Sequence, residues 1–276
     1  MTDRIESPHG APSPNHETPV LEIDASEITR YPNGDALPAM WITSDAHDCG
    51  DGLVKRSYVC RYSGGDDPHG DDALCFGSWY YEEGMSYMDA ADLVKRIECF
   101  QAAELLYRHS AAHGNATADL CLGYVYSYDR CEGRYWDSAA LSAWDGATPY
   151  PREERAFECL TLAAAAGIPE ACYKLGDMYK NGLGCDPDAL LAFHWYSRAS
   201  GLAKRETPVV LGSIALRLAG CYEEGLGCSQ DFARALEWYR QAVSALEIAV
   251  EAGETWYEKV LAGARAGEKR CAQECG

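Results

Sequence analysis

The residues best suited to chemistry near the N-terminus lie in the segment SDAHDCGDG, residues 44–52. His47, Asp48 and Cys49 are the types that a nucleophilic or metal-assisted reaction needs, because a thiolate attacks, an imidazole accepts a proton and all three bind metals. The same segment is rich in Gly, Asp and Ser, which is typical of a turn. We favour the turn, and keep a hydrolase using these three residues as a third hypothesis.

Two further pairs have the spacing of metal ligands on a helix. His109 and His113 lie four residues apart, which places both on one helix face. The pair is half of a metal site at most, and we interpret it as a solvated stripe. His194 is expected at the surface. Cys271 and Cys275 repeat the spacing in the tail CAQECG, but two thiolates alone make a weak site, so a frayed end is expected.

Cysteine is abundant, with thirteen in 276 residues. The odd number leaves one thiol over from any complete set of disulfides. We expect mostly free thiols that behave as small apolar side chains. The alternative hypothesis for the whole chain is a thiol-rich metal- or redox-responsive protein, which stoichiometric zinc or a reactive low-pKa thiol would favour.

The net charge of the chain limits the classes of molecule that it is expected to bind. The formal net charge is −19 and the isoelectric point is near 4.7, which disfavours nucleic acid and anionic membrane surfaces. A basic or neutral protein fits better. No run of about 18 apolar residues predicts a membrane span, and the polar start has no apolar core of a secretory signal. These features predict a cytoplasmic protein; they do not indicate its oligomeric state.

Two glycine-rich segments are nearly identical. YKNGLGC occupies residues 179–185 and YEEGLGC occupies residues 222–228, 43 positions apart. A phosphate-binding loop needs Lys-Ser or Lys-Thr after its last glycine, and a dinucleotide loop needs a third glycine after a strand. GLGCDP and GLGCSQ have neither. We therefore interpret the two segments as the turns of a structural repeat.

Each repeat predicts a helical hairpin. In the first of these two copies, Gly182 is expected in the left-handed conformation that ends a helix. Gly184 then allows a tight turn, Asp186 is the expected N-cap of the next helix, and Pro187 its first residue. Asp188 would lie in the first turn, where the helix dipole favours negative charge. The copy 43 residues later predicts the same arrangement.

Weaker copies precede these two. Residues 118–126 match the first half of the unit and residues 156–167 the second half, with residues 127–150 between them as an insertion. Residues 73–84 and 102–114 supply a still earlier pair. The insertion is rich in aromatic residues, which either bind a partner or fill a gap between units; these are Tyr128, Tyr135, Trp136, Trp144 and Tyr150.

The pattern A-x3-LG-x2-Y-x2-G-x-G-x3-D-x3-A-x2-WY-x2-A resembles the Sel-one-like repeat family, relatives of the tetratricopeptide repeats. The resemblance covers residues 73–242. Ala219 departs from it by replacing a glycine. A secreted branch of the family joins its helices by cysteine pairs, but here the partner position of Cys172 is Ser200, which argues against regular disulfides.

The resemblance implies an all-α, right-handed α-solenoid of about four helix-turn-helix repeats. We divide the chain into an irregular N-terminal extension (1–70), the repeats (71–243, with the insertion) and C-terminal capping helices (244–276). The first 18 or so residues are expected to be disordered. VLEID and LVKRSYVCRYS are candidate short strands because they are rich in β-branched and aromatic residues.

The function predicted from this resemblance is non-catalytic binding of a protein or peptide, with no cofactor and no metal. First helices of such repeats line a concave groove. Carried over position by position, the expected groove residues are Tyr124, Tyr128, Tyr173, Asp177, Lys180, Asn181, Glu223 and Glu224. Aromatic rings and acids suit a peptide with Lys or Arg anchors. Substituting Tyr173 and Asp177 is expected to weaken capture without unfolding the protein.

Overall fold

The computed structural model describes residues 45–48, 54–57, 67, 69–87, 89–133, 151–204 and 206–276. The chain divides into two compact units, Met1–Asp67 and Pro68–Gly276. In the first unit, β1 (Asp45–Asp48) pairs antiparallel with β2 (Val54–Ser57), with Asp45 opposite Ser57.

This hairpin corrects one expectation and supports another. The segment interpreted as a turn, residues 44–52, contains β1, so His47 and Asp48 lie in a strand. The candidate strand LVKRSYVCRYS contains β2, as its β-branched and aromatic content predicts. VLEID and Cys49 lie outside the described residues.

The second unit is built from helices. Their bounds are α1 (Asp71–Ser86), η1 (Ala90–Asp92), α2 (Leu93–Ala112), α3 (Ala116–Ser127), α5 (Arg152–Ala165), α6 (Pro169–Asn181), α7 (Ala189–Leu202), α8 (Pro208–Glu224), α9 (Phe232–Glu251), η2 (Thr255–Tyr257) and α10 (Glu258–Cys275). Here η denotes a short 3₁₀ helix.

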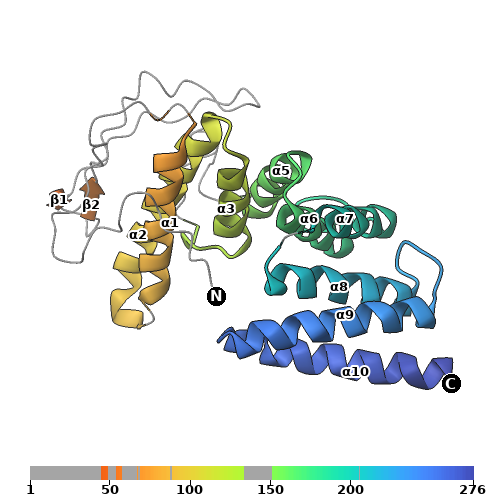
Figure 1. Cartoon of the computed structure of the whole chain (residues 1–276). Coiled ribbons are helices and arrows are strands. Elements are labelled where there is room, and N and C mark those ends of the chain that lie inside the picture. Colours follow the sequence, from red (N-terminus) through yellow and green to blue (C-terminus); the bar gives the residue numbers. More distant parts are fainter. Residues whose placement is uncertain are drawn as a thin grey trace. The chain divides into compact units, whose positions relative to one another are not determined.

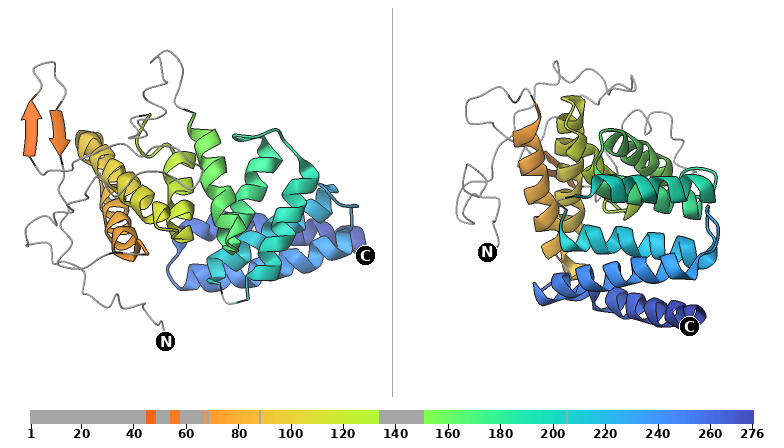
Figure 2. Two further views of the ribbon diagram at one scale, coloured as in Figure 1. Left: turned by 90° about the horizontal axis from the view of Figure 1, so that it is seen from above. Right: turned by 45° about the vertical axis from the view of Figure 1, so that its right-hand side comes forward.

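Successive helices pack as hairpins (Figures 1 and 2). The pairs are α1 with α2, α3 with α5, α6 with α7, and α8 with α9, and each hairpin packs on the next. α10 packs along α9 and closes the described array. The expected all-α solenoid of about four repeats is therefore confirmed in this unit. The pairing of α3 with α5 also agrees with an insertion between them, although the aromatic residues from Tyr135 onward lie outside the described part.

The helices meet through columns of small residues that alternate with aromatic rings. In α7, Ala192, Tyr196 and Ala199 are buried, and the equivalent residues of α9 are buried as well. Small alanines let neighbouring helix backbones approach, and the large rings fill the space between them. This sequence pattern explains why the helices stack into a continuous core.

The two glycines of each G-L-G segment have different tasks. Gly225 ends α8 with φ 72° and donates its N–H to the carbonyl of Cys221, as expected for a left-handed helix end. Gly227, with φ 68°, lies against the start of α7 in the preceding hairpin, where a Cβ would stand 2.7 Å from the carbonyl carbon of Ala189. Gly182 and Gly184 repeat both roles one unit earlier.

The helix starts differ from the sequence prediction by two residues. The N-cap of α7 is Asp188, whose Oδ1 accepts the N–H of Leu191 at 2.9 Å, so Asp186 is not the cap and Pro187 precedes the helix. The reason is a backbone hydrogen bond from Asp188 N–H to the carbonyl of Tyr179, 2.8 Å, which holds the preceding residues in the turn. The next unit behaves in the same way, with Asp231 as the N-cap of α9.

The C-terminal end is more ordered than the sequence suggested. α10 runs to Cys275, and Cys271 is fully buried in a cluster that includes Tyr239 and Leu246. The frayed-end interpretation of this tail is therefore wrong. The apolar face of α10 supplies the burial, with Leu261 and Ala264 on the same face as Cys271.

Candidate functional site

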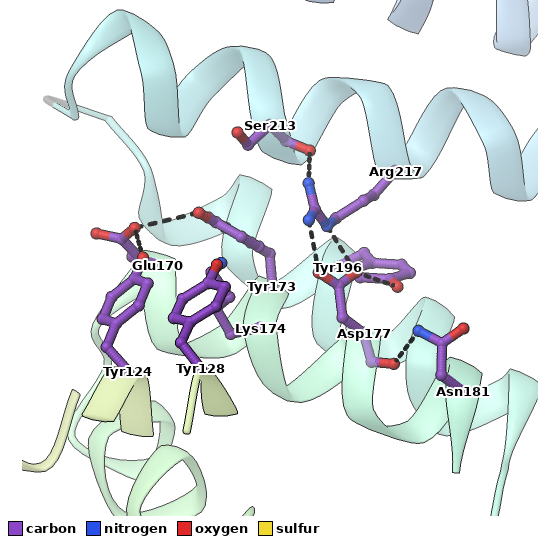
Figure 3. Close-up of polar contacts among 10 residues, drawn as sticks. All are labelled: Tyr124, Tyr128, Glu170, Tyr173, Lys174, Asp177, Asn181, Tyr196, Ser213 and Arg217. Carbon is purple, nitrogen blue, oxygen red and sulfur yellow. Dashed lines mark hydrogen bonds and ion pairs between the residues drawn. The ribbon is translucent and has the colours of Figure 1, made fainter. Parts of the chain in front are cut away.

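The eight predicted groove residues all lie on first helices of successive hairpins. α3 ends at Ser127 and carries Tyr124, with Tyr128 as its C-cap. α6 and α8 hold the others, which are Tyr173, Asp177, Lys180, Asn181, Glu223 and Glu224. Because α6 also packs against α8, these side chains form one face of the array. Figure 3 shows the part of this face around α6.

Two tyrosines and a lysine form a partly exposed cluster on this face. The rings of Tyr124 and Tyr128 are stacked, with centroids 5.7 Å apart and an interplanar angle of 11°. Nζ of Lys174 lies 4.9 Å from the Tyr124 ring centroid and donates to the Tyr128 hydroxyl at 3.1 Å. The guanidinium of Arg130 lies 5.0 Å from the centroid of the Tyr128 ring, and the side chain of Tyr128 remains 51% exposed. Cation–π attraction orders the lysine over the rings.

Tyr173 is not available in the same way. It is only 3% exposed, and its hydroxyl donates to Oε1 of Glu170 at 3.1 Å. The hydroxyl of Tyr124 donates to the same oxygen, as Figure 3 shows. Burial raises the pKa of both tyrosines, so their hydroxyls stay protonated and donate to the carboxylate. Glu170 therefore ties the α3 hairpin to the α6 hairpin.

Asp177 is occupied by the next hairpin. Nε and Nη2 of Arg217 donate to its two carboxylate oxygens at 2.6 and 2.5 Å, and the Tyr196 hydroxyl donates to Oδ1 at 2.8 Å (Figure 3). Burial alone would lower the pKa of Arg217, but its hydrogen bonds to Asp177 raise it overall. The guanidinium also lies 4.4 Å from the centroid of the Tyr173 ring. A bidentate pair of this kind fixes the orientation of both helices.

Glu223 is also engaged within the chain. Its carboxylate accepts two hydrogen bonds from Arg270 of α10, 2.8 and 3.0 Å, and one from the Tyr239 hydroxyl. The hydrogen bonds from Arg270 lower the pKa of Glu223. Tyr173, Asp177 and Glu223 are therefore structural ties. The predicted test that substitutes Tyr173 and Asp177 would disturb the packing of repeats.

The remaining predicted residues are accessible. Lys180 and Glu224 form a loose ion pair across α6 and α8, with 3.8 Å between Nζ and Oε2. Asn181 is exposed, and its Nδ2 donates to the Asp177 carbonyl at 2.7 Å. With Tyr128, these three side chains give a row that we call the first-helix row. It is polar and aromatic, with one charge of each sign.

Three residues of this face were missed by the sequence prediction: Glu170, Lys174 and Arg217. The repeat alignment contains a signal for two of them. The shift of 43 residues aligns Lys174 with Arg217, and Tyr124 occupies the position in its unit that Asp177 occupies in the next. In the structure each basic residue reaches back to the preceding hairpin, Lys174 to the Tyr124 ring and Arg217 to the Asp177 carboxylate. We call these contacts the reach-back ties.

Most of the described cysteines lack the environment of a reactive thiol. All eleven of those cysteines are free. Burial is the largest influence on nine of them and raises the pKa of each thiol; they are Cys99, Cys121, Cys131, Cys159, Cys172, Cys185, Cys221, Cys228 and Cys271. The pKa of Cys221 rises to about 12. Raised values keep a thiol protonated and unreactive, which is the opposite of what the redox hypothesis requires.

The histidine pair differs from its prediction. His109 is 8% exposed and therefore not part of a solvated stripe, and its ring centroid lies 4.3 Å from that of His113. The apolar contacts of α2 against its neighbours bury this helix on most sides. His194 is exposed, as expected. Within the described ranges, no three His, Cys, Asp or Glu side chains gather closely enough to hold a metal ion.

A helix that crosses a lipid bilayer must be long and apolar. Among the helices described, none combines the length and apolar character that crossing the bilayer demands.

Comparison with known proteins gives a short match to one curated protein. Over 82 residues the chain is 42% identical to the chitin synthase regulator SKT5 of Saccharomyces cerevisiae. The match covers 28% of this chain but only 12% of that protein, so the chain spans a small part of its relative.

Two solved structures are similar over larger parts of the chain. A Sel1 repeat protein from Oxalobacter formigenes is 25% identical, with a TM-score of 0.37, covering 50% of this chain and 88% of that one. The protective antigen c5321 of uropathogenic Escherichia coli, which displays an SLR fold, is 20% identical, with a TM-score of 0.36, covering 74% and 45% respectively.

The family model of the Sel1 repeat matches residues 139–168, 169–202 and 215–245. The second match begins and ends with the α6–α7 hairpin, and the third lies within α8 and α9. Each of these two matches therefore corresponds to one hairpin of the structure. The chain therefore contains three matches to the Sel1 repeat, and the second and third coincide with stacked hairpins of the fold.

Proposed function

We propose that the first-helix face binds an extended segment of another protein and that the chain acts as a non-catalytic scaffold. The observation that carries the proposal is the first-helix row itself. Tyr128, Lys180, Asn181 and Glu224 are all exposed, and they come from three successive first helices. A row of accessible side chains spread over several repeats suits a partner that lies along the array.

The partly buried contacts between hairpins support this proposal because they hold neighbouring first helices together. Arg217 and Glu170 lock α8 and α3 to α6 through hydrogen bonds that involve Asp177, Tyr173 and Tyr124. A surface held in place before binding loses less conformational entropy when a partner docks. The relative from Saccharomyces cerevisiae is described as a regulator, and a regulator that works by contact needs such a surface.

The chemistry of the partner at this face follows from the charges that remain free. Asp177 and Glu223 are neutralised within the chain, and Glu224 is paired loosely with Lys180. The first-helix row therefore presents an aromatic ring, a side-chain amide and one charge of each sign, so it has no excess of acidic groups. We propose recognition through aromatic contact with Tyr128 and hydrogen bonds to Asn181, in place of the Lys or Arg anchors that composition suggested.

A peptide selection tests the proposal. A random peptide library displayed on phage is selected on the wild-type protein, and enriched peptides are then measured against a Tyr128→Ala, Asn181→Ala double variant. We expect binding to weaken by about tenfold, because an exposed aromatic anchor dominates small interfaces. The control is Leu190→Ala, which changes a 70% exposed side chain on the second helix α7.

Two results would contradict the proposal. One is that no peptide is enriched above an unrelated protein. The other is that the double variant binds the enriched peptides as well as the wild type and the Leu190→Ala control do. All three proteins are compared by circular dichroism, since the exposed positions should leave the helices intact.

A further inference from the structure

A cleft that contains three glutamates lies between α9 and α10, and none of its lining residues belongs to the first-helix row. Its volume is about 280 Å³, and it is lined by Glu247, Val250, Glu251, Glu258, Leu261 and Arg265. Val250 and Leu261 give it an apolar floor, and Leu261 is 7% exposed. We call it the α9–α10 cleft. Figure 1 shows the two helices side by side, joined through η2.

The acids of the cleft are not balanced by the chain. Glu247 pairs with Arg265 at 2.8 Å. Glu251 and Glu258 have no cationic partner among the described residues. From residue 247 to residue 258 the sequence contains four glutamates and neither lysine nor arginine. Lys259 and Arg265 follow, so residues 247–265 hold four glutamates against two cations, and the local potential is negative.

Two large apolar side chains stand exposed beside these acids. Trp256 is 79% exposed, and its indole N–H donates to Oε2 of Glu254 at 3.0 Å. Ile248 is 53% exposed and lies one helical turn from Glu251, on the same side of α9. An exposed tryptophan rimmed by charge is typical of a docking surface.

We propose that the α9–α10 cleft, with Ile248 and Trp256, docks a segment of a partner protein that alternates basic and apolar residues. Charge complementarity selects this occupant. Glu251 and Glu258 gain a countercharge from Lys or Arg, and Trp256 offers a face to the same cations. A second copy of this chain would bring a net charge of −19 to an acidic surface, which opposes self-association here.

The residues that line this cleft differ from those of the first-helix row. The sequence predicted that acids and aromatic rings of the groove bind a basic partner. In this proposal the acids that bind such a partner are those of the α9–α10 cleft, and the aromatic ring is that of Trp256. Asp177 of the groove is bonded within the chain, whereas Glu251 and Glu258 of the cleft have no ion pair among the described residues. A single scaffold would then hold two segments by different chemistry.

The test uses a short fluorescein-labelled peptide in which Lys and Leu alternate, together with a twin that has Glu for Lys. Anisotropy at physiological ionic strength measures binding to the full chain. The Glu251→Gln, Glu258→Gln variant should weaken the Lys peptide at least about fivefold, and Trp256→Ala about tenfold. The matched control is Glu237→Gln, Glu274→Gln, which removes the same charge from the same helices and should change binding less than about twofold.

Each other outcome overturns the proposal. Equal losses in the cleft variant and the control would show attraction by net charge alone. Equal binding of the Glu twin would exclude charge selection. Self-association that disappears in Trp256→Ala, seen by analytical ultracentrifugation, would make the occupant a second copy. Circular dichroism of every variant establishes that a loss of binding is not a loss of fold.

Discussion

Replacing Gly227 by alanine measures how closely neighbouring repeats are docked. The residue has φ 68°, and a Cβ there would overlap the carbonyl oxygen of Ala189 in the preceding hairpin. Gly225 has nearly the same backbone, φ 72°, but the nearest heavy atoms to its Cβ position are 3.5 Å away. The two positions therefore differ in contact and hardly at all in backbone strain.

The magnitudes follow from these contacts. Alanine at Gly225 adds only left-handed strain, roughly 1–2 kcal/mol of unfolding free energy. Alanine at Gly227 adds the same strain and an overlap with rigid backbone, which costs roughly another 1–3 kcal/mol because no side chain can rotate away. We expect a loss of about 2–5 kcal/mol at Gly227. Gly184 and Gly182 form an equivalent pair one repeat earlier, so the order should recur there.

Urea denaturation followed by circular dichroism gives the free energies. Repeat arrays can unfold in parts, so hydrogen exchange of the amides near Ala189 identifies which junction has opened. If Gly227→Ala and Gly225→Ala lose the same stability, the close approach between hairpins does not contribute. Equal protection near Ala189 in both variants would lead to the same conclusion.

Three other predictions concern single residues. Arg217→Met leaves Asp177 without its bidentate partner, so we expect urea denaturation to show roughly 1–3 kcal/mol lower stability, and an unchanged midpoint would refute the tie. Burial raises the pKa of Asp119 to about 7 from 3.8, so the folded state holds a proton that the unfolded state has lost, and stability should fall as pH rises from about 4 to 7. Asp119→Asn should remove that slope, and urea midpoints measured at several pH values that keep the wild-type slope would contradict it. Cys221, 1% exposed, should react with iodoacetamide far more slowly than the exposed Cys275 in a timed mass-spectrometric assay, and equal rates would show that the core opens readily.

The helical hairpins could be predicted because their signals are local. Gly182 and Gly225 must adopt positive φ to end a helix, and that requirement is visible in the sequence without knowledge of the fold. The helix starts were misplaced because the N-cap depends on a longer contact. Asp188 becomes the cap only when its N–H bonds to Tyr179, nine residues back, and Asp186 is an equally good cap by composition.

The sequence could predict on which helices the candidate groove residues lie, but it could not predict which of their side chains are free. The repeat alignment placed Tyr128 and Asp177 on the same face, as the structure does. Whether a side chain on that face is free depends on partners far away in the sequence, such as Arg217, which is 40 residues from Asp177. Composition also suggested basic partners, and it could not distinguish acids that are bonded within the chain from acids such as Glu251.

The reach-back ties have a consequence for how such arrays grow. The α6 unit carries an acceptor for the unit that follows, Asp177, and a cation for the unit before it, Lys174. An in-frame duplication of residues 171–213 would thus bring both halves of a junction with it. Lengthening the array needs no compensating change elsewhere, whereas cutting it after residue 204 would strip Asp177 of its counter-ion and leave a stranded charge at the new end.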